Sequence, residues 1–299
     1  MDGVRRRLSE VSERRACKVI KQPRSTHRYR PKRCDFEDRL VKRLHELARE
    51  RPRFGTPRVT ELLRREGWNV NEKRIARLRR REGLKVPVKQ HKRRRLGSTS
   101  QGILHRRAEH IDHVWSYDFI SDQTEDGRRL KILPIVDEFT RECLTLEVGR
   151  HFTSLDLIEV LDYLIEVRGA PRYIRSDNGP EFIAAAVRTW LADSGVRTLF
   201  IEPGSPWENA YVESFNSRLR DELLDRELFV SLGEARVVLE DHRLDYNHRR
   251  PHSSLGYLTP ATFAARCRET VSASAPIGAC APSASRHINP HQTLIGAGT

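Results

Sequence analysis

The chain lacks the segments that would carry it into or across a membrane. No apolar run reaches the roughly 18 residues that a membrane helix needs, and no basic-then-apolar signal segment opens the sequence. Cysteine is also scarce: five residues, at positions 17, 34, 143, 267 and 280, form no CxxC pair. Scattered cysteines in odd number favour reduced thiols and a cytoplasmic setting, and they argue against a zinc site. We therefore expect no membrane partner.

Acidic residues are few in the first third of the chain. Residues 1–110 contain 35 Lys and Arg against 13 Asp and Glu, a net charge of +22, whereas residues 111–299 contain 20 against 28, a net charge of −8. A basic region of this strength is typical of proteins that bind a polyanion such as nucleic acid. The alternative is a solvated basic surface. An acidic membrane fits less well, because no helix with a broad apolar face accompanies the charge.

The basic region divides into three parts. Residues 1–35 are predicted to be a basic N-terminal arm, with a short helix near 8–20 followed by an extended segment. Residues 36–87 contain three helical patterns, and the last two, joined through Gly67, match a helix-turn-helix DNA-binding domain. The cationic face of its final helix is formed by Lys73, Arg77, Arg80 and Arg81. A small helical bundle with an arginine-rich surface is the alternative. Residues 88–110 form a basic linker that either follows phosphates or stays solvated.

Residues 111–270 alternate between strand and helix patterns. Strands are expected at 114–121, 130–137, 142–148, 172–176 and 197–202, and helices at 154–168, 180–193, 207–226 and 232–247. Three successive strands predict an antiparallel meander, and the later strand–helix alternation predicts parallel additions. The expected fold class is α/β, a mixed sheet flanked by helices and preceded by the small all-α domain. Residues 271–299, rich in Ser, Ala, Pro and Gly, are expected to be disordered.

Three acids in this second region are candidates for one site. Asp118 lies in the strand-like run VWSYDFISD, Asp177 ends the strand-like YIRSD, and Glu213 lies on a predicted helix. Three carboxylates brought together repel each other, by roughly 4 kcal/mol per pair at ~4 Å and an effective dielectric constant of ~20. Mg²⁺ or Mn²⁺ relieves that repulsion, since hard cations prefer oxygen ligands. Two such ions roughly 3.5–4 Å apart suit phosphoryl transfer.

Each acid also has an ordinary interpretation. Asp177 could cap a turn at Asn178 and Gly179. Glu213 could be an exposed helix residue, although it borders the apolar stripe of its helix. Glu208 competes as the third acid, but its place in the first helical turn favours a role as a cap or partner of the helix dipole.

Three runs near these acids resemble a known family. IRSDNGPEF, EPGSPWENAYVESFNSRLRDELL and YNHRRPHSSLGYLTP are similar to the catalytic core of insertion-sequence transposases of the OrfB type, which share the retroviral-integrase core. The 35 residues between Asp177 and Glu213 match the acidic signature of that superfamily. The resemblance covers about 112–262, and the run from 51 to 84 resembles the helix-turn-helix segment that precedes the core. No His/Cys zinc module of the retroviral kind is present, and His105, His110 and His113 are interpreted as linker residues.

The resemblance implies a ribonuclease H-like fold and a DNA transposase of the DDE type. Such an enzyme cleaves DNA at the ends of its element and transfers the exposed strand to a target. Asp118, Asp177 and Glu213 would hold two Mg²⁺ or Mn²⁺ ions, with Asp118 bridging both. Asn178 and Asn209 would position the DNA. The implied partners are double-stranded DNA at the element ends and target, further copies of the chain on DNA, and an upstream OrfA product or a fusion with it. The implied location is the bacterial cytoplasm, at the nucleoid.

Several basic residues and two other functions stay open at this point. Arg175, Arg218 and Arg220 either meet phosphates or lie on the surface, and Arg249, Arg250 and His252 either lie near DNA or compensate a helix dipole. A related nuclease that cuts without joining is one alternative function. A DNA-binding repressor with an inactive core is the other, although the intact set of three acids disfavours it.

Overall fold

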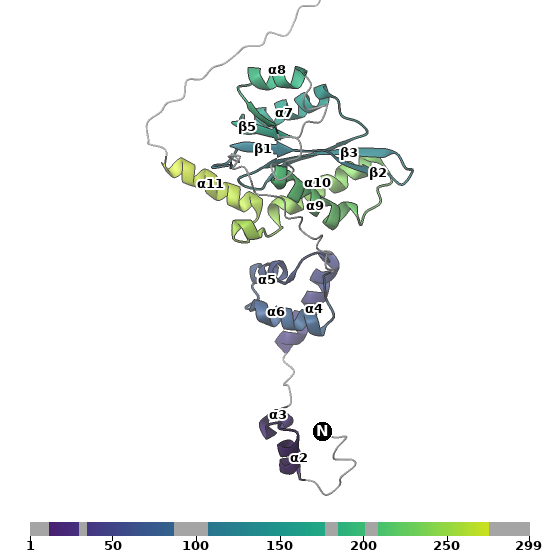
Figure 1. Cartoon of the computed structure of the whole chain (residues 1–299), viewed down its shortest axis with the longest axis vertical. Helices are drawn as coiled ribbons and strands as arrows, with labels where there is room; N and C mark the ends of the chain where they lie inside the picture. The colour runs from purple at the N-terminus through teal and green to yellow at the C-terminus, as the bar shows by residue number, and fades with distance from the viewer. Residues whose placement is uncertain (1–11, 30–34, 87–106, 177–184, 201–208, 275–299) are drawn as a thin grey trace, which may run out of the picture. The chain divides into compact units, whose positions relative to one another are not determined.

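The computed structural model describes residues 12–29, 35–86, 107–176, 185–200 and 209–274 (Figure 1). The chain forms two compact units, residues 1–98 and 99–299. No helix among these described ranges is long and apolar enough to cross a membrane.

The first unit is entirely helical in its described part. Its helices are α2 (Glu13–Val19), α3 (Arg24–Arg28), α4 (Asp35–Glu50), α5 (Thr56–Arg65) and α6 (Glu72–Arg81). The short α3 corrects the expectation of an extended segment after residue 20. It is tied to α2 because Arg28 donates two hydrogen bonds to the Glu13 carboxylate, at 2.8 and 2.9 Å. This contact between two helices is not visible in local sequence periodicity.

Helices α4 to α6 enclose a small apolar core. The buried side chains come from the positions with helical spacing: Leu40, Leu44 and Leu47 of α4, Val59 and Leu63 of α5, and Ile75 and Leu78 of α6. Asn71 precedes α6 and its side chain accepts a hydrogen bond from the Lys73 amide at 2.9 Å, as an N-cap residue does. The three helices predicted over residues 36–87 are therefore confirmed.

The second unit is built on a six-stranded mixed sheet. Its strands are β1 (Val114–Tyr117), β2 (Ile120–Gln123), β3 (Arg129–Asp137), β4 (Cys143–Gly149), β5 (Tyr173–Ser176) and β6 (Arg197–Phe200). The long β3 pairs antiparallel with β4 on one side and with β1 and β2 on the other. Strand β5 runs parallel to β1, and β6 runs parallel to β5. This is the expected α/β fold class, an antiparallel meander extended by parallel strands.

Helices cover both faces of this sheet (Figure 1). Helices α7 (Ser154–Arg168) and α8 (Ala185–Asp193) pack on one face, where β3 contributes Leu133 and Ile135 to the core. On the other face lie α9 (Ala210–Leu219), the π-helical turn η2 (Arg220–Leu224) and α10 (Leu232–His248), which pack against Ile132 and Val136 of β3. Alternate residues of β3 thus enter two separate cores, as the twofold period of a strand requires.

Two helical features differ from expectation. The helix predicted over 207–226 is divided, because its regular part ends at Leu219 and is followed by η2. Helix α11 (Pro260–Ser274) was not predicted, and it extends four residues into the segment expected to be disordered. Its few apolar residues give a weak helical pattern, and it packs against α10. The contact with α10 therefore stabilises α11, although its own sequence pattern does not predict a helix.

Candidate active site

Asp118 lies at a break between two strands that share one register. Tyr117 of β1 pairs with Ile135, and Ile120 of β2 pairs with Ile132, so the same register places Asp118 opposite Pro134. The amide N–H of Glu138 donates to the carbonyl of Val114. Every second residue of an antiparallel strand directs its N–H at the same neighbour, so the N–H at position 134 would also be directed at β1. Proline has no N–H to donate. The ladder is interrupted at Asp118 for this reason, and the predicted single strand 114–121 becomes two.

Both oxygens of the Asp118 carboxylate accept hydrogen bonds. The amide of Phe119 donates to Oδ1 at 2.8 Å, and the Asn216 side chain on α9 donates to Oδ2 at 2.9 Å. Asn216 is 8% exposed. Its Oδ1 accepts no hydrogen bond within the described residues. The carboxylate is therefore held in one orientation by its own loop and by α9.

Glu213 lies in the first turn of α9, three residues before Asn216. Residues three apart on a helix are neighbours on its surface, so the Glu213 carboxylate and the Asn216 amide share one edge of α9. Glu213 is exposed, while the stripe of Val212, Phe215 and Leu219 is buried beneath it. Partial burial raises the pKa of the Glu213 carboxyl above its ordinary value. Helix α9 thus carries one candidate acid and a residue that holds another.

The other candidate site residues are placed as follows. Asn209 is buried at the start of α9, and its Nδ2 donates to the Tyr117 carbonyl at 3.5 Å. Its Oδ1 accepts no hydrogen bond from the described residues. Asp177, Asn178 and Glu208 lie outside the described residues. Because β5 is parallel to β1 and ends at Ser176, the chain leaves β5 at the end of the sheet where Asp118 lies.

Asn216 is the residue that sequence reasoning missed at this site. The signal was available, because position 216 is three residues from Glu213 on the same helix edge. What the sequence did not contain was the contact with Asp118, which lies 98 residues earlier.

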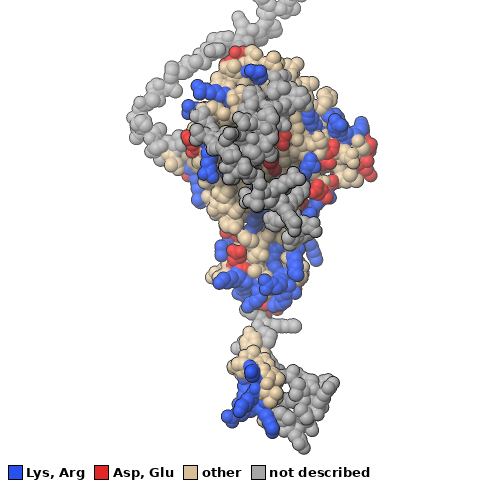
Figure 2. Space-filling model, viewed as in Figure 1, with Lys and Arg blue, Asp and Glu red and all other residues tan. Residues whose placement is uncertain are grey.

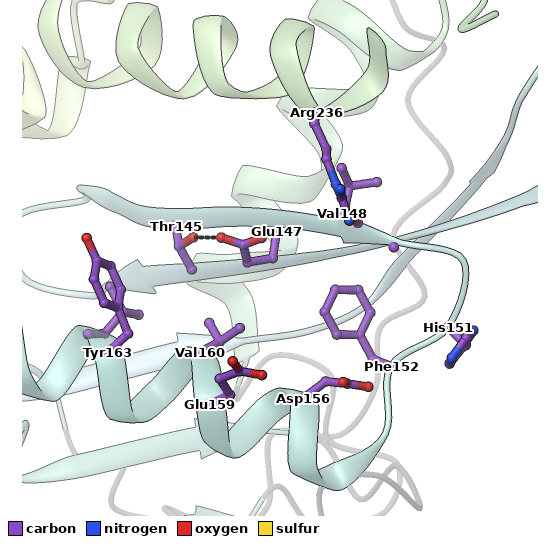
Figure 3. Close-up of a pocket in the computed structure, with 12 residues that line it drawn as sticks. Thr145, Glu147, Val148, His151, Phe152, Asp156, Glu159, Val160, Tyr163 and Arg236 are labelled. Atoms are coloured by element: carbon purple, nitrogen blue, oxygen red, sulfur yellow. Dashed lines mark hydrogen bonds between the residues drawn. The ribbon is translucent and has the colours of Figure 1, made fainter. Parts of the chain in front are cut away.

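A cavity of about 460 Å³ lies elsewhere in the second unit (Figure 3). It is bounded by β4 and α7, with Arg236 of α10 at one side. Neither Asp118 nor Glu213 lines it. Its carboxylates include Asp156, which is occupied in capping α7 by its bonds to Thr153. This cavity therefore belongs to the packing of an edge strand and not to the candidate active site.

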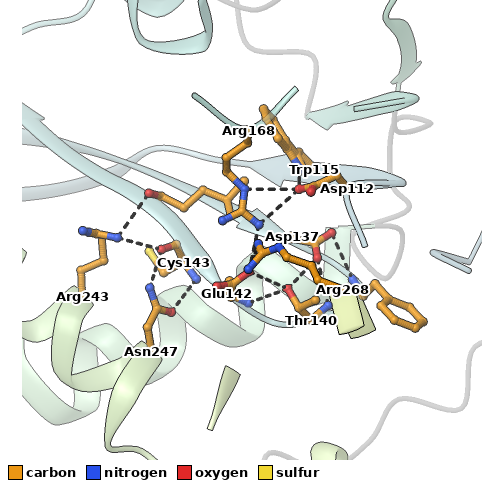
Figure 4. A network of polar contacts seen from close by, with 12 residues as sticks. Asp112, Trp115, Asp137, Thr140, Glu142, Cys143, Arg168, Arg243, Asn247 and Arg268 are labelled. Carbon is orange, nitrogen blue, oxygen red and sulfur yellow. Dashed lines mark hydrogen bonds and ion pairs between the residues drawn. The ribbon is translucent and has the colours of Figure 1, made fainter. Parts of the chain in front are cut away.

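A buried polar network lies near the other end of β1 (Figure 4). Arg168 contacts Asp112 at 3.3 Å and Glu142 at 2.9 Å, while the Asp137 carboxylate accepts from the amide and hydroxyl of Thr140. Burial raises the pKa of Asp137 to about 6, even though the Thr140 bonds act to lower it. These groups stabilise the turn between β3 and β4.

Next to this network, Glu138 and Arg175 form a buried ion pair. Arg175 Nε lies 3.0 Å from Glu138 Oε1, and the side chains are 8% and 0% exposed. Burial raises the pKa of Glu138 to about 7, and Arg175 and Arg141 oppose the rise. Arg175 is thus engaged inside the protein. The predicted alternative in which it is a surface residue does not hold.

The cationic face predicted on α6 is partly neutralised. Lys73, Arg77 and Arg80 are exposed and make no ion pair with a described residue. Arg81, although exposed, lies 2.7 Å from Glu37 and 2.9 Å from Glu82. Figure 2 shows many other Lys and Arg side chains on the surface of this helical unit.

The cluster YNHRRPHSS contributes fewer surface cations than its sequence suggests. The Arg250 side chain is 1% exposed and binds the Glu222 carboxylate through Nε at 2.9 Å and Nη2 at 2.5 Å. His252 is buried against Tyr246, with ring centroids 4.7 Å apart. Arg250 and His252 are enclosed by α10 and η2, so of their two predicted roles the burial disfavours direct contact with DNA.

His113 is likewise part of the core rather than of a linker. It is buried, its Nδ1 accepts from the Glu109 amide at 3.0 Å, and it stacks on His110 at 4.5 Å between centroids. His105 lies outside the described residues.

Comparisons with known proteins agree with this arrangement. Two family models described as "Integrase core domain" match residues 108–206 and 194–260, and one described as "HTH-like domain" matches residues 35–94. The "Insertion element IS407 uncharacterized 31.7 kDa protein" of Burkholderia multivorans is 41% identical over 280 residues, which is 92% of this chain and 98% of that protein.

Two further relatives are more distant. The "Insertion element IS476 uncharacterized 39.2 kDa protein" of Xanthomonas euvesicatoria is 40% identical, over 89% of this chain and 77% of that protein. The "Putative transposase InsK for insertion sequence element IS150" of Escherichia coli is 27% identical, over 81% of this chain and 89% of that protein.

Proposed function

The chain belongs to the insertion-element transposases of the OrfB type, and we propose that it cuts DNA at the ends of its element and joins the freed strands to a target through Asp118, Asp177 and Glu213. The observation that carries this proposal is the junction between the sheet and α9. There Asn216 holds Asp118 in place, on the same helix edge as Glu213.

The oxygen donors at this junction fit divalent cations. Asp118 and Glu213 supply carboxylates, and the Oδ1 atoms of Asn209 and Asn216 are buried without a hydrogen-bond donor among the described residues. We propose two Mg²⁺ or Mn²⁺ ions, held by Asp118, Glu213 and Asp177. Divalent ions polarise the phosphoryl group and stabilise the charge on the attacking and leaving oxygens. Asn216 and the Phe119 amide keep the Asp118 carboxylate oriented for that purpose.

We propose that both units contact DNA. In the first unit, Lys73, Arg77 and Arg80 of α6 are exposed for contact with the duplex, and Arg81 belongs to the same face. In the second unit, Asn178 and Asn209 are proposed to position the strand to be cut. Because Asn209 is buried and bonded to Tyr117, it also fixes the start of α9 against β1.

The reaction itself sets the proposed partners. Two element ends and a target must be handled together, so we propose that several copies of the chain assemble on double-stranded DNA. The resemblance to OrfB proteins adds an upstream OrfA product, or a fusion with it, as a further partner. With DNA as substrate, the proposed place of action is the bacterial nucleoid, in the cytoplasm.

The decisive experiment removes one acid at a time. Purified full-length variants Asp177→Asn and Glu213→Gln are incubated with Mg²⁺, a duplex carrying the terminal repeat of the element, and a target duplex. Both should lose cleavage and joining while binding the terminal repeat nearly as well as the wild type. Retention of joining by Asp177→Asn would sink the assignment.

Glu208→Gln is the matched control on the same segment. It should be much milder than Glu213→Gln, because the sequence favours a capping role for Glu208 over a role as a metal ligand. Equal loss in the two variants would reopen the identity of the third acid.

A further inference from the structure

Helix α9 presents two different edges on either side of its buried stripe. One edge carries the active-site residues Glu213 and Asn216. At 100° per residue, Tyr211 and Arg218 fall on the opposite edge, seven residues apart and therefore one above the other. That second edge faces the turn between β3 and β4, since the guanidinium of Arg141 from this turn lies over the Tyr211 ring, 3.8 Å from its centroid.

Cations gather around Tyr211. Burial acts to raise the pKa of the Tyr211 hydroxyl, but hydrogen bonds from Arg141 and Arg107 outweigh it and lower the pKa. Arg141 also donates to the Glu138 carbonyl at 2.5 Å. The charge of Arg141 opposes the rise in the Glu138 pKa, but the Glu138 carboxylate forms its ion pair with Arg175. Arg141 thus lies over the Tyr211 ring, and Arg107 adds a second guanidinium at the Tyr211 hydroxyl.

Arg218 adds a third cation on the same edge. It is partly buried and makes no hydrogen bond or ion pair with any described residue. Burial is the main cause that lowers the pKa of the Arg218 guanidinium. The charges of Arg250 and Arg141 also lower this pKa, whereas Tyr246 and Glu222 act to raise it. Both oxygens of Glu222 are bonded by Arg250. Because Glu222 is already bonded to Arg250, a partly buried Arg218 without a described ion-pair partner of its own would be stabilised by an anion from outside the chain.

The surface of α9 between its two edges is narrow and smooth. Its outward residues are Ala210, Ser214 and Ser217, whose side chains are all small. A helix is about 10–12 Å across with its side chains, and DNA rises 3.4 Å per nucleotide along one strand, so about three nucleotides could span it. A sugar-phosphate backbone can therefore cross α9 without meeting a bulky side chain.

We propose that Arg218 and Arg141, arranged around Tyr211, bind a backbone phosphate of the DNA strand whose reacting phosphodiester lies at the acids on the other edge of α9. This proposal rests on the proposed function, and it adds a phosphate site on the far side of the catalytic helix. Arg107, at the entry to the second unit, would approach the same strand through its contact with Tyr211.

The test compares Arg218→Gln with Arg188→Gln in the full chain. Arg188 is exposed on α8, on the opposite face of the sheet, and its loss removes the same charge. Affinity for DNA is measured by fluorescence anisotropy without divalent metal, over 50 to 200 mM salt. One duplex carries the terminal repeat, and a second, unrelated duplex represents the target.

Arg218→Gln should weaken binding and make the slope of log affinity against log salt concentration shallower by about 0.9, the value for one phosphate contact. From 50 to 200 mM salt, the affinity of the variant should then fall about 3.5-fold less than that of the wild type. Arg218→Lys should retain most of the slope, and Arg188→Gln should leave it unchanged. The free Arg218→Gln protein should melt at the same temperature as the wild type or higher, because an uncompensated cation has been removed. An effect confined to one duplex identifies which DNA supplies the phosphate.

The inference is wrong if Arg218→Gln binds both duplexes with the wild-type slope, or if it lowers the melting temperature and Arg218→Lys fails to restore binding. The first result means that no phosphate is bound there, and the second means that Arg218 only supports the fold. Cleavage by the wild type with Mg²⁺ is scored separately. If the wild type cleaves and Arg218→Gln binds normally, only this phosphate site is refuted, and if the wild type does not cleave, the proposed function fails instead.

Discussion

At the scale of single residues, the candidate site depends on side chains that do no chemistry. Pro134 withholds an amide and opens the strand at Asp118, and Asn216 then fixes the freed carboxylate from α9. The position of Asp118 thus depends on the hydrogen bond that Pro134 cannot donate to β1 and on the hydrogen bond that Asn216 donates to the carboxylate.

Replacing Asn216 with Ala should impair the reaction without unfolding the core. The Asp118 carboxylate would lose the donor on Oδ2, and removal of such an outer partner typically costs about 10–100-fold in metal affinity or activity. The measurement is the cleavage rate as a function of Mg²⁺ concentration, with the exposed neighbour substitution Ser217→Ala as control. Equal rates and equal Mg²⁺ midpoints in Asn216→Ala and the wild type would contradict the role given to Asn216.

The buried pair of Glu138 and Arg175 predicts a pH dependence of stability. The pKa of Glu138 is raised from 4.5 to about 7, so the folded state binds its proton more tightly than the unfolded state does. This contribution to stability is complete below about pH 4.5 and is lost as the pH rises through about 7, by about 3 kcal/mol in total.

Glu138→Gln should remove that titration. Between about pH 5 and about pH 8, the free energy of unfolding should fall by about 2–3 kcal/mol less in the variant than in the wild type. Urea unfolding at both pH values measures the difference, and Glu159→Gln, exposed on α7, is the control. An unchanged pH dependence in Glu138→Gln would show that the carboxyl titrates normally. Asp137, with a pKa of about 6, would still contribute its own part.

At the scale of secondary-structure elements, α6 illustrates how a charge pattern is edited by packing. Four cations share the predicted face, but Arg81 is already paired with Glu37 of α4 and with Glu82. Arg79 lies outside that face and is buried, and its Nη2 donates to the Phe54 carbonyl at 3.0 Å. Exposure of a cation and availability of its charge are therefore separate properties.

Arg77→Gln should weaken DNA binding more than Arg81→Gln. Arg77 has no described acidic partner, so its removal should lower the salt slope by about 0.9, the value for one phosphate contact. Arg81→Gln should change the slope less, because Glu37 and Glu82 compensate part of its charge. Salt titrations of binding to one duplex compare the two variants directly. Equal slopes would mean that Arg81 breaks its ion pairs with Glu37 and Glu82 when the protein binds DNA.

At the scale of the whole molecule, charge is divided between the two units. Residues 1–98 contain 33 Lys and Arg against 12 Asp and Glu, a net charge of +21, whereas the chain as a whole carries +14. The acids of the candidate site thus lie in the unit that repels DNA on average, and the basic unit is needed to bring the substrate to them.

Deleting residues 1–98 should lower DNA affinity and flatten its dependence on salt. If the full chain makes 6–10 phosphate contacts, it should lose about 10³–10⁵ in affinity between 50 and 200 mM salt, and the truncated protein should lose far less. The second unit has its own sheet and cores, so circular dichroism should show it folded. Equal binding by both proteins at every salt concentration would refute the division of labour.

Much of the secondary structure was accessible to pattern reasoning. The helix predicted over 154–168 coincides with α7, because Leu157, Leu161 and Leu164 repeat at helical spacing and enter one core. The strand at Asp118 was misjudged, since β-branched and aromatic neighbours predict a continuous strand and give no sign of Pro134 in the facing strand. Helix α11 was missed because its support comes from α10 and not from its own pattern.

The order of residues alone was enough for the charge asymmetry, the three helices over residues 36–87 and the three acids with their spacing. These properties depend on composition and on short periodicities. Which polar groups are free to act was settled by folding. Arg250 and His113 are enclosed, Arg81 is paired, Arg218 has no described partner, and Asn216 meets Asp118 across 98 residues. Burial and long-range pairing arise only when distant segments come together, so no local pattern could have revealed them.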